Sequence, residues 1–136
     1  PICVELIAFI LNNHPDAFEN IEITSYETTL LERFQALLPG VPCDLLIPLN
    51  DPWMKPDVLA YTALKRGKLA GACAVHLHAS QLSLDAVCAI RAGGCDVHAW
   101  GVNDIQALNT AYNLQIERIC TDNLQQALEF REEIRT

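Results

Sequence analysis

Two apolar segments of the chain carry histidine or tryptophan at two-residue spacing. His76 and His78 form one pair, and His98 and Trp100 form the other. Because side chains alternate between the two faces of a β-strand, each pair shares one face if its segment is a strand. Imidazoles move protons near neutral pH and bind metal ions. A tryptophan at a strand end can form the wall of a pocket. Both pairs are therefore candidates for acid–base, metal or binding chemistry.

A metal cluster built from His76, His78 and His98 is one interpretation of this pattern. None of these histidines has the spacing of a metal motif, and the six cysteines form no C-x-x-C pair. We therefore favour hydrogen-bonded histidines in the core or around a site over metal ligands.

The elements that must position these residues alternate along the chain. Apolar, β-branched segments predict strands at 20–25, 43–49, 70–77, 95–100 and 116–121. Helical spacing predicts helices over 2–13, after Ser25, within 50–68, and over 83–94, 103–113 and 121–134. Candidate caps are Ser25, Asn103 or Asp104, and Thr121 or Asp122, and the helix at 83–94, "SLDAVCAIRAGG", is also expected to be capped.

This alternation predicts an α/β fold with parallel βα repeats. An open doubly wound sheet of five strands fits the pattern. Part of a (β/α)8 TIM-type barrel also fits, although 136 residues are too few for a whole barrel of about 250. Periodicity does not separate the two, but both place chemistry at the carboxyl ends of the strands.

Polar and aromatic residues gather at those predicted ends, while the strand bodies are apolar. Thr121, Asp122 and Asn103 are also common helix-cap types, so each has an ordinary structural explanation. Trp100 is different, because a cap does not need an indole ring.

Composition bounds the remaining possibilities. The length suits a single domain over 1–136, and the net charge of −8 argues against a nucleic-acid partner. No apolar run reaches the roughly 18 residues of a membrane span. The apolar start at 1–13 lacks the features of a signal peptide and is better explained as a packed helix. Because the chain begins with Pro rather than Met, we expect it to be a fragment or a processed product. Cysteines within apolar runs favour a reduced, cytoplasmic setting.

Three motifs in this order resemble the C-terminal part of the glycerophosphodiester phosphodiesterase family. The segment "GGCDVHAWGVND" is similar to a family strand reading V-x-x-W-T-V-N, and "IERICTD" to a strand reading G-V-D-x-I-x-T-D. Ser25 and Tyr26 resemble the family's Ser-Phe pair. The matching positions are Val97, Trp100, Val102 and Asn103 in the first strand, and Ile116, Ile119, Thr121 and Asp122 in the second. The similarity runs over nearly all of 20–130.

The resemblance implies a partial (β/α)8 barrel containing strands four to eight. It also implies that the complete barrel hydrolyses a glycerophosphodiester to an alcohol and glycerol 3-phosphate, in lipid metabolism, with Ca²⁺ or Mg²⁺. The residues expected to bind this small substrate are Ser25, Tyr26, His78, Trp100, Asn103 and Asp122.

The family's chemical motifs do not occur in this sequence. These are an His-Arg pair, a Glu-x-Asp pair, a further His and a Glu-x-Lys. We therefore expect no catalytic residue, no metal ligand and no cofactor from this chain, and no activity of these residues alone. The chain also departs from the family patterns at Gly101, at 115–117 and at Leu124.

Two other functions stay open. One is a non-catalytic half-barrel that binds a partner or forms a homo-oligomer, since missing strands would leave apolar residues such as Ile23, Leu46 and Val75 near uncovered edges. The other is a flavodoxin-like binding module. The segment "ITSYET" weakens it, because a Gly-rich phosphate loop would be expected there.

Overall fold

The computed structural model describes residues 2–51 and 53–135. It contains four short parallel strands, each followed by a helix. The elements in chain order are α1 (Ile2–Asn12), η1 (Pro15–Asn20), β1 (Ile23–Ser25), α2 (Thr28–Leu37), β2 (Cys43–Leu46), α3 (Pro56–Leu69), β3 (Ala74–His78), η2 (Ala79–Gln81), α4 (Leu84–Ala92), β4 (Asp96–Trp100), α5 (Ile105–Asn113) and α6 (Leu124–Glu133). No helix among the described residues is long and apolar enough to cross a membrane.

The strands pair in sequential order, β1-β2-β3-β4, and every pairing is parallel. The sequential order is that of a (β/α) barrel wall, whereas a flavodoxin-like sheet has the order 2-1-3-4-5. In this register His76 lies beside His98, and His78 lies beside Trp100. The predicted α/β class with parallel repeats is therefore confirmed.

The prediction of a fifth strand at 116–121 is wrong. This segment makes one isolated parallel bridge, between Ile119 and Ala99. The N–H of Cys120 donates to the carbonyl of Ala99 at 2.8 Å, and the N–H of Ala99 donates to the carbonyl of Arg118 at 3.1 Å. The N–H of Val102, just after β4, also donates to the carbonyl of Cys120 at 3.1 Å. The described residues provide no further strand beyond this segment.

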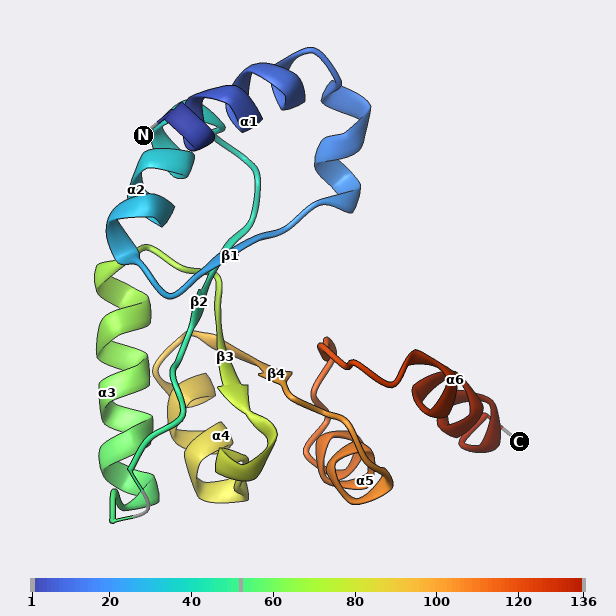
Figure 1. The fold of residues 1–136 in the computed structure, drawn as a ribbon. Helices are drawn as coiled ribbons and strands as arrows, with labels where there is room; N and C mark the ends of the chain where they lie inside the picture. The colour runs from blue at the N-terminus through green and yellow to red at the C-terminus, as the bar shows by residue number, and fades with distance from the viewer. Residues whose placement is uncertain (1, 52, 136) are drawn as a thin grey trace.

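Helices α2, α3 and α4 cover one face of the sheet and enclose the main core (Figure 1). Leu45, Val75, Leu77 and Val97 point into this core and are fully buried. Val75 therefore lies under the helices. Because β3 has β2 and β4 on its two sides, our expectation that Val75 would lie near an uncovered edge is wrong. The residues one position away along each strand face the opposite side of the sheet.

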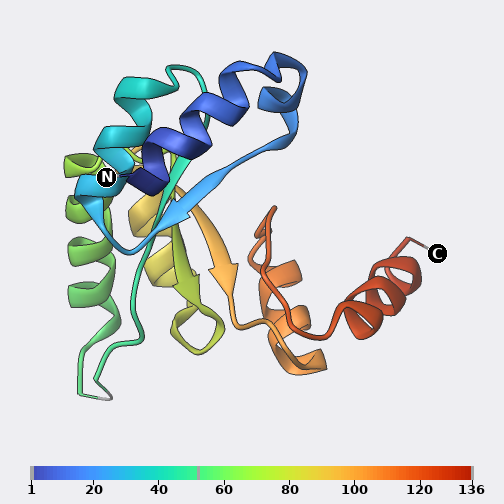
Figure 2. The same ribbon diagram turned by 45° about the horizontal axis from the view of Figure 1, so that its top comes forward.

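The last two helices form a smaller apolar cluster at the end of the chain. Figure 2 shows α6 lying apart from the sheet, beside α5. Tyr112 and Phe130 join the two helices with an edge-to-face ring contact at 6.1 Å. The buried residues of this cluster include Val102 and Leu108, which pack with Ala99 of β4.

Two of the predicted helix caps are confirmed and two are wrong. Ser83 accepts a hydrogen bond from the N–H of Ala86, as expected for a capped helix at 83–94, and Asp104 accepts one from Ala107. Ser25 does not cap α2, because its hydroxyl accepts from the N–H of Glu27 in the preceding turn. Helix α6 is capped by Asn123 rather than by Thr121 or Asp122.

Candidate functional site

Three aromatic rings meet at the carboxyl ends of the strands. Trp100 contacts His78 edge-on at a ring separation of 4.5 Å and Tyr26 at 6.3 Å. The indole N–H of Trp100 donates to the carbonyl of Ile47 at 3.1 Å, which fixes the ring over β2. Tyr26, His78 and Trp100 are called the aromatic rim. Three of the residues that we expected to bind substrate therefore lie together.

The imidazole of His78 has a defined orientation. Its Nδ1 accepts a hydrogen bond from the N–H of Ser80 at 3.2 Å, and the hydroxyl of Ser80 lies 2.7 Å from the same atom. Because Nδ1 acts as an acceptor, a neutral ring carries its proton on Nε2. A hollow of about 270 Å³ lies next to this ring, between η2 and α5.

Gly101 explains the departure from the W-T-V-N pattern. Its φ is +69°, a conformation that residues with a side chain rarely adopt. A β-carbon there would lie only 2.7 Å from Nε2 of His78. His78 therefore fills the space that the family's threonine would need.

The other predicted site residues do not join the aromatic rim. Asn103 donates to Asp122 at 2.8 Å and accepts the N–H of Asp122 at 2.8 Å, so the two residues form a reciprocal pair. This pair joins the start of α5 to the turn before α6. Ser25 ends β1 at the same edge of the sheet, but its hydroxyl is used in the local turn.

A second set of polar side chains lies one layer below the rim, on the face opposite the helices. It contains Glu22, Asp44, His76 and His98, which we call the inner cluster. The ligand-type atoms of these four residues all lie within 4.8 Å of one another. Asp44, His76 and His98 are buried, with at most 5% of each residue exposed.

Asp44 is the centre of the inner cluster. Its Oδ2 lies 3.1 Å from Nε2 of His76 and 3.0 Å from Nδ1 of His98, and its Oδ1 accepts the N–H of Ala74 at 3.0 Å. Burial raises the pKa of Asp44, but the hydrogen bonds from the two imidazoles outweigh it and hold the pKa well below its usual range. The carboxylate is therefore ionised at neutral pH.

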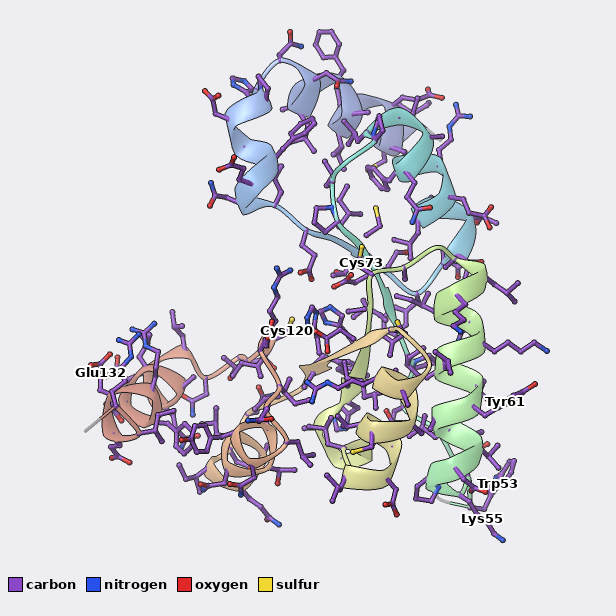
Figure 3. All side chains as sticks on the ribbon, turned by 180° about the vertical axis from the view of Figure 1, so that it is seen from behind. Trp53, Lys55, Tyr61, Cys73, Cys120 and Glu132 are labelled. Carbon is purple, nitrogen blue, oxygen red and sulfur yellow. The ribbon has the colours of Figure 1, made fainter. Side chains whose placement is uncertain are left out.

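Glu22 connects the inner cluster to solvent. Its Oε1 lies 3.2 Å from Nε2 of His76, and its other oxygen accepts a hydrogen bond from Arg118. This bond raises the pKa of Arg118. Figure 3 shows Cys120, two residues after Arg118, on the side of the sheet away from α3.

Sequence reasoning missed Glu22 and Asp44 as members of this cluster. A signal was present for Asp44, because one carboxylate interrupts the apolar segment "CDLLI". A charge inside a buried strand requires a partner. The partner could not be named, since His98 lies 54 positions away in the sequence.

The fold of this chain is similar to that of several solved structures. No protein-family model matches the sequence, and no curated protein matches it. Among solved structures, a protein designated a glycerophosphoryl diester phosphodiesterase from Agrobacterium tumefaciens matches 97% of this chain with a TM-score of 0.78 and 18% identity. A glycerophosphodiester phosphodiesterase from Parabacteroides distasonis matches 98% of it with a TM-score of 0.71 and 15% identity.

The chain has the fold of half a glycerophosphodiester phosphodiesterase. It spans 51% of each of these two structures, and 49% of a third, from Galdieria sulphuraria, designated a member of the same class. The predicted resemblance is thus confirmed at the level of the fold.

The described residues do not fit the Ca²⁺ or Mg²⁺ ion that the resemblance implies. Both ions prefer sites built from oxygen ligands. The inner cluster offers two imidazole nitrogens with its carboxylates, and Asp122 is already paired with Asn103. No step of phosphodiester chemistry is therefore assigned to such an ion here.

Proposed function

We propose that this chain forms the C-terminal half of a barrel that hydrolyses a glycerophosphodiester to an alcohol and glycerol 3-phosphate. The observation that carries the proposal is the match of nearly the whole chain to half of three structures with phosphodiesterase names. Residues 1–136 would act as a single folding unit within that barrel. The missing elements would supply the phosphoryl chemistry.

The aromatic rim supports a role in substrate binding. Trp100 and Tyr26 present apolar ring surface at the carboxyl end of the sheet, where α/β enzymes bind their substrates. The N–H at Nε2 of His78 is a hydrogen-bond donor beside the indole ring. In this proposal Trp100 packs against the glycerol portion, and the Asn103–Asp122 pair orders the neighbouring loops.

We expect no release of glycerol 3-phosphate from glycerophosphocholine by these 136 residues alone. Hydrolysis needs neutralised phosphoryl charge and a proton for the leaving group, and the expected motifs for both are missing. The measurement is an enzyme-coupled assay of glycerol 3-phosphate with added Ca²⁺ or Mg²⁺. Ion-dependent turnover that disappears in His78→Ala or Asp122→Ala would contradict this expectation.

A second experiment uses the longer protein that the parent gene encodes when its sequence upstream of Pro1 is included. If the proposal is correct, this longer protein is active. Trp100→Ala then lowers kcat/KM by about tenfold, since an aromatic contact contributes roughly 0.5–1.5 kcal/mol. Tyr61→Ala is the control, because Tyr61 is 66% exposed and lies along α3 (Figure 3). Equal losses in the two variants, or an inactive longer protein, would refute the role.

Self-association is the second candidate function, and α1 favours it. Ile2, Leu6 and Phe9 recur at helical spacing and are more than half exposed. An apolar stripe of this kind, together with the free edge of β1, is suited to pairing with another chain or with the missing half.

We expect the isolated chain to sediment as a dimer or larger species at micromolar concentration. Burial of the α1 stripe provides the driving force, at roughly 25 cal/mol per Å². Leu6→Glu together with Phe9→Glu should return it to a monomer, while Tyr61→Glu on the outer side of α3 should not. A single species near 15.1 kDa for the unmodified chain would contradict the expectation.

The thiols support a cytoplasmic location for the proposed enzyme. All six cysteines are free, and Cys3, Cys73, Cys88 and Cys120 are exposed. Free exposed thiols persist in a reducing compartment.

A further inference from the structure

We propose that the inner cluster is a binding site for one divalent transition-metal ion, of which Zn²⁺ is the reference case. The ligand atoms are Oε1 of Glu22, Oδ2 of Asp44, Nε2 of His76 and Nδ1 of His98. The inference does not depend on the proposed phosphodiesterase function, because these side chains lie below the aromatic rim.

The spacing of the buried ligand atoms matches metal coordination. Asp44, His76 and His98 place three atoms at the corners of a triangle with sides of 3.0, 3.1 and 3.2 Å. An ion with tetrahedral bonds of about 2.0 Å separates its ligands by about 3.3 Å. Oε1 of Glu22 lies 3.2 Å from the His76 corner and supplies a fourth ligand. The three buried atoms therefore have nearly the spacing of an occupied site, and all four ligand atoms lie within 4.8 Å of one another.

Hydrogen bonding alone satisfies this arrangement poorly. A neutral imidazole has one N–H, and both rings would have to direct theirs at the same oxygen of Asp44. Their nitrogens are only 3.2 Å apart, so the two hydrogens would be crowded. Nδ1 of His76 is buried and has no partner among the described residues, so no bond there fixes the tautomer. Two lone pairs directed at one cation remove the crowding.

The charge balance also favours a cation. Arg118 pairs with Glu22, but no lysine or arginine among the described residues pairs with Asp44. Asp44 is 1% exposed. Buried charges in proteins are usually paired or bound to a metal. A divalent ion next to this carboxylate would supply the missing positive charge.

The ligand types decide which ions would bind. Two imidazoles and two carboxylates suit Zn²⁺ and its neighbours in the first transition row, whereas Ca²⁺ and Mg²⁺ prefer oxygen alone. Four protein ligands leave a tetrahedral ion no open position, which is typical of a structural site. Strands β2, β3 and β4 each contribute one ligand, and Glu22 directly precedes β1. The ion would therefore join all four strands of the sheet.

The test is calorimetric titration of Zn²⁺ into the untagged chain after removal of metals with a chelator. We expect one ion per chain and a rise in melting temperature, and no such response to Mg²⁺ or Ca²⁺. Co²⁺ should give the visible absorption of a tetrahedral nitrogen and oxygen site, without thiolate charge-transfer bands. A folded chain that binds no ion, or a thiolate spectrum, would overturn the proposal.

Four variants locate the ion. Asp44→Asn and His98→Gln should each lower the Zn²⁺ affinity by about tenfold or more, since even outer-shell partners are worth that much. His14→Gln is the matched control, because His14 is exposed, lies between α1 and η1, and is not part of the inner cluster. Cys120→Ser tests the exposed thiol that lies near Glu22. Retained affinity in both cluster variants would refute the site. If they do not fold, the Co²⁺ spectrum of the unmodified chain decides.

Discussion

Replacing Asp44 with alanine is expected to lower the free energy of unfolding by about 3–5 kcal/mol in metal-free buffer. The change removes the shared acceptor of His76, His98 and the N–H of Ala74, all of which are buried. Each buried donor left without a partner costs about 1–3 kcal/mol. Urea denaturation monitored by circular dichroism measures the loss.

Asp51→Ala is the control for this prediction, because Asp51 is exposed and precedes α3. It should change stability by no more than about 0.5 kcal/mol. Acid provides a second measurement. Because the native pKa of Asp44 lies below the unfolded value of about 3.9, its contribution is complete above that pH and is lost as the pH falls toward the native pKa. A stability equal to that of the Asp51 variant would show that the hydrogen bonds of Asp44 contribute little.

Replacing Leu45 with alanine is expected to cost about 2–5 kcal/mol of unfolding free energy. Leu45 is fully buried in the core between β2 and the covering helices. Its truncation removes apolar contacts and leaves a cavity. Because β2 is hydrogen-bonded to both β1 and β3, it cannot move to fill that cavity. A loss of this size is a large fraction of the stability of a typical domain, about 5–15 kcal/mol.

Leu49→Ala is the matched control, since Leu49 follows β2 and is 57% exposed. Leu45→Met should cost less than about 1.5 kcal/mol, because it nearly preserves the core volume. If Leu45→Ala proves as mild as Leu49→Ala, then the covering helices do not form the tight core that the burial of Leu45 indicates.

Local patterns determined most of the elements. Apolar β-branched segments predict strands and amphipathic segments predict helices, because apolar residues on one face recur every two positions in a strand and about every 3.6 positions in a helix. Helix α1, strands β2 to β4 and the caps at Ser83 and Asp104 follow from such short-range rules. Parallel pairing also follows, because a helix between two strands returns the chain to the end of the sheet where the first strand began.

The segment 116–121 shows a limit of prediction from local sequence patterns. Its apolar residues are typical of a strand, yet a strand is defined by its neighbour, and only β4 lies beside it. The sequential strand order was undetermined for the same reason. Periodicity describes which side of a segment is apolar, but it does not identify the partner of that segment.

The aromatic rim was within reach of the sequence, since Trp100 and His78 stand at predicted strand ends. The contact of their rings and the space taken from position 101 depend on the register between β3 and β4. Only the tertiary structure decided the inner cluster. Glu22, Asp44, His76 and His98 come from four places in the chain, and they converge because the strand twist and register place them in one layer. Short-range propensity carries no information about such a layer, because its contacts are set by the pairing of distant segments.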